Sequence, residues 1–118
     1  MGNFCNFHES AENIRMEESH ILSADLRDPH DNKLNHTTLD LNHCIGNVNG
    51  KLKWGGKNFS MSAKNVHLTL EGPDSMPMLH AQLMNEKGME TSAELDLPEH
   101  IGNRDGNFLV EPKYMNDI

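Results

Sequence analysis

Apolar and polar residues alternate over several short stretches of the chain, and a period of two predicts β-strands. In the segment 21–26, for example, Leu22, Ala24 and Leu26 share one face. No segment keeps a period of 3.6 residues over three turns, so long helices are not expected. The same reading predicts further strands over residues 13–17, 34–41, 52–54 and 108–110, and single helical turns near residues 7–12 and 59–64. The chain is therefore predicted to be all-β with short helical turns.

Two dipeptides, Asn49-Gly50 and Asp105-Gly106, are the strongest short turn signals in the chain. Glycine tolerates positive φ angles, and an Asx-Gly pair suits the tight turn of a β-hairpin. Each dipeptide directly precedes one of the expected apolar strands. Two β-hairpins are therefore predicted at these turns.

The chain repeats itself, which is its most informative feature. Residues 39–50 reappear as residues 95–106 at an offset of 56 with no gap. Shorter matches relate 6–14 to 58–66 and 21–26 to 78–83. A unit of about 50 residues rarely folds alone without metals or disulfides, so the copies should share one core. We expect one domain over residues 1–118, with repeat 1 at about 6–54 and repeat 2 at about 58–110.

Charge and hydropathy exclude several classes of protein. Ten Lys and Arg against 18 Asp and Glu give a net charge of −8, which argues against a nucleic-acid-binding surface. No apolar run approaches the roughly 20 residues that span a bilayer, so no membrane insertion is expected. The first residues lack a basic stretch followed by an apolar one, so no secretory signal is expected. Together with Cys5 and Cys44, which fall in no CxxC motif, this predicts free thiols and a cytoplasmic location.

Asparagine is the commonest residue, at 14 positions. It is depleted in helices and strands and enriched in turns and caps. Its side chain carries both donors and an acceptor. This composition predicts many turns, a surface that hydrogen-bonds neutral polar ligands, or both.

The repeated residues resemble the cyanovirin-N homologue family over about residues 6–110. The resemblance rests on the doubled Leu-Asp-Leu-x-x-x-Ile-Gly-Asn-x-(Asn/Asp)-Gly, on Leu52-Lys53-Trp54 after its first copy, and on the doubled Asn-Phe-x-x-Ser-Ala-x-Asn. It implies two pseudo-symmetric halves, each a three-stranded sheet plus a β-hairpin, with the hairpins crossing between halves. It also implies non-covalent binding of carbohydrates, often mannose-containing glycans, with no catalysis and no cofactor.

The resemblance further implies up to one carbohydrate site in each half. By position, the first-half site comprises Asn6, Glu9, Ser10, Arg27, Asp28, Asn103, Arg104 and Asp105. The second-half site comprises Asn47, Val48, Asn49, Lys57, Asn58, Met61, Ser62, Met84, Asn85 and Glu86. The family often has an acidic or amide residue at the position of Met61, so the second site lacks one polar contact.

The family's founding lectin has cysteines where this chain has Ala11, Leu26, Ala63 and Leu83. Both of its disulfides are therefore replaced by apolar residues, which suits a reducing compartment.

Structural interpretations compete with the functional ones. Ser10, Ser62, Asn47 and Asn103 could simply be capping and turn residues. Trp54 could form a sugar-stacking platform, but its place in an alternating strand favours a core position.

Metal-dependent and catalytic functions find no support in the sequence. None of the eight histidines belongs to an HxxxH or HxxH pair, so no metal site is expected. Glu9 and the pair Glu17-Glu18 could act as glycosidase carboxylates, but nothing makes them converge, and 118 residues leave little room for a deep cleft. We therefore expect no enzyme.

The leading hypothesis is a lectin for mannose-type oligosaccharides or glycoproteins. The alternative is an interaction module on the same scaffold, with degraded sugar sites, that binds a protein through exposed methionines such as Met84 and Met89. The chain is expected to be a monomer. The joint Trp54-Gly55-Gly56-Lys57 is expected to be a flexible hinge, so a domain-swapped dimer through Gly55-Gly56 is possible.

Overall fold

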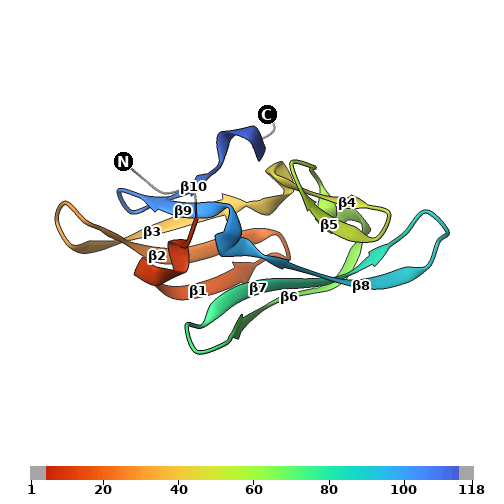
Figure 1. The fold of residues 1–118 in the computed structure, drawn as a ribbon, viewed down its shortest axis with the longest axis horizontal. Coiled ribbons are helices and arrows are strands. Elements are labelled where there is room, and N and C mark those ends of the chain that lie inside the picture. Colours follow the sequence, from red (N-terminus) through yellow and green to blue (C-terminus); the bar gives the residue numbers. More distant parts are fainter. Residues whose placement is uncertain (1–4, 115–118) are drawn as a thin grey trace.

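The computed structural model describes residues 5–114, which form antiparallel sheets and short 3-10 turns (Figure 1). The strands are β1 (Ala11–Glu17), β2 (Ile21–Asp28), β3 (Lys33–Asp40), β4 (Ile45–Val48), β5 (Lys51–Trp54), β6 (Ala63–Glu71), β7 (Met76–Met84), β8 (Glu90–Asp96), β9 (Ile101–Arg104) and β10 (Asn107–Val110). The 3-10 turns are η1 (Phe7–Ser10), η2 (Leu41–His43), η3 (Phe59–Ser62), η4 (Leu97–Glu99) and η5 (Pro112–Tyr114). The all-β prediction is confirmed. Residues 1–4, part of the stretch in which no secretory signal was found, lie outside the described residues.

Most of the expected strands are present, with small differences at their ends. The strand expected over 34–41 stops at Asp40 because Leu41 begins η2. A carboxylate oxygen of Asp40 accepts the backbone N–H of Asn42 at 2.9 Å, which turns the chain out of the sheet. The helical turns expected near 7–12 and 59–64 are each shorter, because strands begin at Ala11 and Ala63.

The two repeats build the same sheet twice. The order is β1-β2-β3 in one sheet and β6-β7-β8 in the other. Ala11 lies opposite Leu26 in the first sheet, and Ala63 lies opposite Leu83 in the second. Each first strand then shifts register, between Glu12 and Arg15 and between Lys64 and His67. The positions at which the founding lectin has cysteines are therefore cross-strand neighbours here.

The abundance of asparagine has a backbone explanation. Asparagine adopts left-handed φ angles more readily than other non-glycine residues because its short side chain bonds locally. In the described chain, these angles occur at Asn6, Asn13, Asn32, Asn49, Asn58 and Asn65. Asn6 and Asn58 precede η1 and η3, and Asn13 and Asn65 lie at the register shifts. Duplication of these turns therefore accounts for part of the composition.

The two hairpins pack against the sheets of the opposite repeat. Hairpin β4–β5, from repeat 1, contacts β8, and hairpin β9–β10, from repeat 2, contacts β3 (Figure 1). The backbone N–H of Phe108 in β10 reaches the hydroxyl of Thr37 in β3 at 3.4 Å. Each half of the molecule thus contains chain from both repeats.

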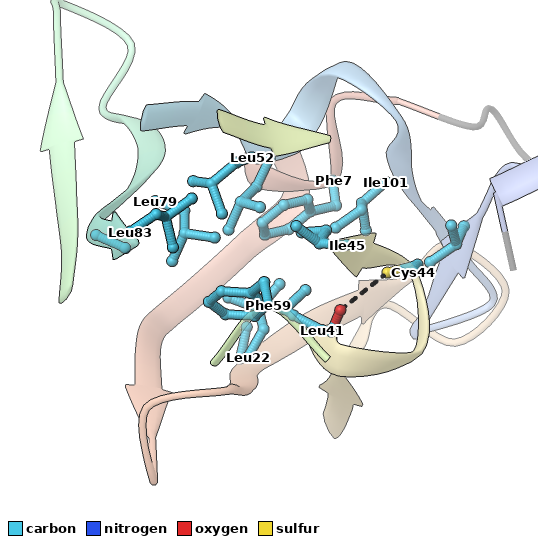
Figure 2. Close-up of a cluster of buried hydrophobic side chains, with 14 of the residues drawn as sticks. Phe7, Leu22, Leu41, Cys44, Ile45, Leu52, Phe59, Leu79, Leu83 and Ile101 are labelled. Carbon is cyan, nitrogen blue, oxygen red and sulfur yellow. Dashed lines mark hydrogen bonds between the residues drawn. The ribbon is translucent and has the colours of Figure 1, made fainter. Parts of the chain in front are cut away.

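A single cluster of buried apolar side chains joins the halves (Figure 2). Phe7 and Phe59, at equivalent positions of the two repeats, are fully buried in it, and Phe7 meets Phe108 edge-on at 5.2 Å. The other large members are Leu22, Leu26, Leu41, Ile45, Leu79, Leu83, Leu97 and Ile101. Neither repeat has a complete core of its own, as expected for units of this size. Trp54 packs against the rim of this cluster beside His100 and Tyr114, so the expected core position suits it better than a sugar platform.

The joint between the repeats is packed more tightly than a flexible hinge would be. Gly46 and Gly56 approach so closely that a Cβ on Gly56 would stand 2.7 Å from the Cα of Gly46. Gly55 has a φ of 90° and donates its N–H to the carbonyl of Cys44 at 2.8 Å. These glycines therefore have steric reasons to be there. Domain swapping through them stays a prediction.

Both cysteines are free thiols, as expected. Burial, with a smaller contribution from the Asp40 charge, raises the pKa of the Cys44 thiol to about 12. This thiol is therefore unreactive at neutral pH. Among the described residues, no helix is long and apolar enough to cross a membrane.

Candidate functional site

In the second half, the candidate site is organised around the amide of Asn47. Its nitrogen donates to the hydroxyl of Ser62 at 2.8 Å and to the carbonyl of Met84 at 2.9 Å, and its oxygen accepts the N–H of Gly50 at 2.8 Å. One side chain thus ties the β4–β5 turn to η3 and to the end of β7. Both amide hydrogens are used, so Asn47 shapes the site rather than offering them to a ligand.

Asn103 repeats this arrangement in the first half. Its amide nitrogen donates to the hydroxyl of Ser10 at 2.7 Å and to the carbonyl of Arg27 at 2.8 Å. Its oxygen accepts the N–H of Gly106 at 2.9 Å. The hydrogen bonds of Asn47 and Asn103 therefore agree with the interpretation of these two residues as turn residues. The hydroxyls of Ser10 and Ser62 accept these bonds and keep their own hydrogens available to donate.

Two residues that the sequence analysis missed hold the same turns from the sheet side. The amide of Asn35 donates to the carbonyl of Gly106 at 2.8 Å, and the hydroxyl of Thr91 donates to the carbonyl of Gly50 at 2.7 Å. Asn35 and Thr91 are 56 positions apart, the offset that relates the two turns. Extending the repeat alignment upstream of residue 39 would have pointed to both.

The two halves differ where the turns meet the loops after β2 and β7. In the second half, the side-chain oxygen of Asn49 accepts the backbone N–H of Glu86 at 3.0 Å. In the first half the position equivalent to Glu86 is Pro29, which has no N–H to donate. There Asp105, the equivalent of Asn49, instead contacts the imidazole Nε2 of His30 at 2.9 Å.

In the second half, two adjacent surface hollows contain most of the predicted site residues. The first, of about 310 Å³, is lined by Asn47, Val48, Asn49, Met84, Asn85 and Glu86, all of them predicted. The second, of about 320 Å³, is lined by Met61, Ser62 and Met84 together with Ala63, Lys64, Gln82 and Glu90. Met84 lines both hollows, which meet at its side chain. Lys57 and Asn58 line neither hollow, although both side chains are exposed.

The first-half hollow, of about 350 Å³, contains fewer of the predicted residues. Its lining is Asp28, Asp31, Lys33, Leu34, Asn35, Asp105 and Asn107, of which only Asp28 and Asp105 were predicted. The guanidinium of Arg27 turns away to the carbonyl of Asn32 at 2.8 Å and to Glu12 at 3.4 Å. Three further predicted residues are exposed: Asn6, which precedes η1, Glu9, which lies in η1, and Arg104, the last residue of β9. For both halves, the role of these residues in sugar binding stays a prediction.

Comparison with known proteins agrees with the resemblance inferred from the repeat. A family model described as CVNH domain matches residues 7–109. A cyanovirin-N homolog of Neurospora crassa is 34% identical over 107 residues, covering 87% of this chain and 96% of that protein. The NMR structure of a Gibberella zeae CVNH protein superposes with a TM-score of 0.84 at 43% identity, covering 89% of this chain and 96% of that one. The structure of a microvirin:mannobiose complex superposes with a TM-score of 0.80 at 26% identity, covering 91% and 99%.

Proposed function

Because this chain belongs to the CVNH domain family, we propose that it is a lectin that binds mannose-containing glycans non-covalently. The family is one of carbohydrate-binding lectins and is not a known enzyme family. The observation that carries the proposal is the second-half hollow, whose lining consists of residues that the family resemblance had assigned to a sugar site. A structural relative, microvirin, is in complex with mannobiose.

The chemistry of the two second-half hollows suits a neutral sugar. Hydroxyl groups both donate and accept, and the Ser62 hydroxyl, the Asn85 amide and the Glu86 carboxylate offer complementary groups around the β4–β5 turn. Each hydrogen bond to sugar replaces one to water, so each contributes only about 0.5–1.5 kcal/mol. A single shallow site should therefore bind a small sugar in the micromolar to millimolar range. If both halves bind, a branched glycan would gain roughly 10²–10⁴-fold in avidity.

The test is a titration of the ¹⁵N-labelled protein with an α-linked mannobiose, followed by amide chemical shifts. We expect saturable shifts at Asn49, Asn85 and Glu86, and at Asp28 and Asp105 if the first half also binds. Millimolar sugar that moves no amide in either set would refute the proposal.

Two matched variants assign the response to each half. Ser62→Ala should weaken the second-half response alone, and Ser10→Ala should weaken the first-half response alone. Shifts that persist unchanged at both sites in the double variant would show that the Ser10 and Ser62 hydroxyls do not contribute to sugar binding.

A protein-interaction module is the second candidate, and it rests on the exposed methionines of the second half. Met61 is 79% exposed, Met89 60% and Met84 40%, which is unusual for large apolar side chains. A protein partner bound through this surface would be retained in excess mannobiose, whereas a glycoprotein bound as a lectin ligand would be released.

We further propose that the chain is a monomer and that it is located in the cytoplasm. The location is supported by a buried free thiol and by apolar residues at the positions where the founding lectin has cysteines, since both suit a reducing compartment.

A further inference from the structure

One imidazole and two carboxylates meet where the loop after β2 approaches the β9–β10 turn. One ligand atom each from Asp28, His30 and Asp105 lies within 4.8 Å of the other two. We propose that these residues bind a divalent metal ion of the zinc class and thereby bridge the two repeats. Since Asp28 and His30 come from repeat 1 and Asp105 from repeat 2, a bound ion would link segments 75 residues apart.

The local backbone already holds the three side chains in place. A carboxylate oxygen of Asp28 accepts the backbone N–H of His30 at 2.9 Å, which folds the loop over Pro29. The His30 Nε2 then lies 2.9 Å from Asp105, whose turn is fixed by a left-handed φ of 52°. His30 and Asp105 are exposed, so water can complete the coordination and no buried charge is created.

The loop after β7 begins with the same turn as the loop after β2, but it differs in length and lacks the ligand side chains. The backbone N–H of Lys87 donates to the side chain of Asn85 at 2.9 Å, as that of His30 does to Asp28. The equivalents of Asp28, His30 and Asp105 are thus Asn85, Lys87 and Asn49, a set with neither a carboxylate nor an imidazole. Because Asn85 accepts the same backbone hydrogen bond as Asp28, this turn does not by itself require the ligand set of the first half.

The cluster of three side chains lies beside the hollow of the first half. Asp28 and Asp105 line it together with Asp31, and the amides of Asn35 and Asn107 add further oxygen atoms. The one cationic side chain in this lining is that of Lys33, against three carboxylates. The hollow, of about 350 Å³, therefore offers space for a cation, oxygen ligands and a net negative charge.

The donor set favours zinc-class ions over calcium. Imidazole nitrogen with carboxylate oxygen is a typical zinc combination, whereas calcium takes six to eight oxygen ligands. A bound ion would replace the contact between His30 Nε2 and Asp105, which now lie 2.9 Å apart.

The test is calorimetric titration of the full chain with ZnCl₂ and, separately, with CaCl₂. We expect one saturable Zn²⁺ site that raises the melting temperature, and no comparable Ca²⁺ site. Asp105→Asn, which introduces the residue found in the other repeat, and His30→Gln, which keeps a polar group beside Asp105, should each weaken Zn²⁺ binding by about tenfold or more.

His36→Ala is the matched control, because His36 is also exposed and lies 3.1 Å from a single carboxylate, Asp25. This variant should bind Zn²⁺ like the parent protein. The proposal is overturned if Zn²⁺ binds equally well after either ligand substitution, if His36→Ala weakens binding as much as His30→Gln, or if no saturable site is found. The binding of sugar is not part of this measurement, so its outcome is independent of the lectin proposal.

Discussion

Asp40 and Asp96 stand at equivalent positions 56 residues apart, yet their pKa values move in opposite directions. Burial alone would raise the pKa of Asp40, but hydrogen bonds from the His20 ring at 2.8 Å and from the N–H of Asn42 hold it below its usual value. Burial raises the pKa of Asp96, one of whose oxygens is buried with no hydrogen-bond partner. Two partners of Asp40 have no counterpart at Asp96. Pro77 stands at the position of His20, and Pro98 replaces Asn42 and has no N–H to donate, although the backbone of Glu99 still donates one hydrogen bond to Asp96.

This contrast predicts opposite pH dependences for two amide variants. A lowered pKa stabilises the folded protein above the unfolded-state pKa, and the benefit is lost as pH falls through the folded pKa. A raised pKa stabilises it only at low pH, and the benefit is lost as pH rises through the folded pKa. Asp40→Asn should therefore lose more stability at about pH 7 than at about pH 3. The free energy of unfolding of Asp96→Asn, relative to that of the parent protein, should be higher at neutral pH than at acid pH.

Urea denaturation of both variants and the parent protein at the two pH values measures this directly. Parallel pH trends for Asp40→Asn and Asp96→Asn would contradict the assignment. The double variant should show the two effects added, because the two aspartates lie in different sheets.

The amides of Asn47 and Asn103 lead to a second prediction. Asn103→Ala removes three hydrogen bonds and leaves the buried N–H of Gly106 with a lost partner, so it should cost about 1–3 kcal/mol of stability. In sugar titrations it should abolish shifts only in the first half. Asn47→Ala is the matched variant and should abolish them only in the second half. A loss of both responses in either variant would mean that the sites are not independent.

The close approach at the joint yields a third prediction. Gly56→Ala places a methyl group 2.7 Å from the Cα of Gly46, and backbone cannot move aside as a flexible side chain can. We expect a loss of about 1–3 kcal/mol in the free energy of unfolding. Gly88→Ala is the control, because its Cβ would meet nothing within 4 Å and only its positive φ is unfavourable. If Gly56→Ala unfolds at the same urea concentration as the parent protein, the joint is looser than this packing implies.

The strands, the hairpins and the two similar halves could be predicted because each depends on a local sequence pattern that occurs in both repeats. Alternation of apolar and polar residues predicts which side chains share a strand face, and the offset of 56 makes Asn47 equivalent to Asn103. Contacts between the repeats were harder to predict. The amide of Asn35 reaches Gly106, and His30 reaches Asp105, only because the hairpins pack on the opposite sheets. No spacing rule in the sequence relates residues more than 70 positions apart.

The sequence also did not predict that the second-half surface has two hollows that meet at Met84. Arg27 and Met84 align in the repeats and both offer a backbone carbonyl to an asparagine amide. Their side chains differ in what they contact. The Arg27 guanidinium donates to Glu12 and to Asn32, whereas the Met84 side chain lines two hollows. Side-chain direction depends on neighbouring loops, which differ between the halves.

The pairing of Ala63 with Leu83 across β6 and β7 leads to the last prediction. Replacing both by cysteine should allow a disulfide, because the two residues are direct cross-strand neighbours. Closing a loop of this length stabilises a protein by about 3 kcal/mol. In the reduced state, loss of the fully buried Leu83 side chain should instead cost about 2 kcal/mol or more. Urea denaturation with and without a reductant should therefore give two transitions separated by about 3 kcal/mol, the oxidised form being the more stable.

The single variants Ala63→Cys and Leu83→Cys separate the two effects, because neither should respond to reductant through an intramolecular bond. Their thiol count by mass spectrometry should include Cys5 and Cys44, which are free in the parent protein. A double variant that retains four free thiols under oxidising conditions would show that the side chains at 63 and 83 do not face each other. A bond that forms without raising the stability would show instead that it strains the sheet, since the entropic gain would then be offset in the folded state.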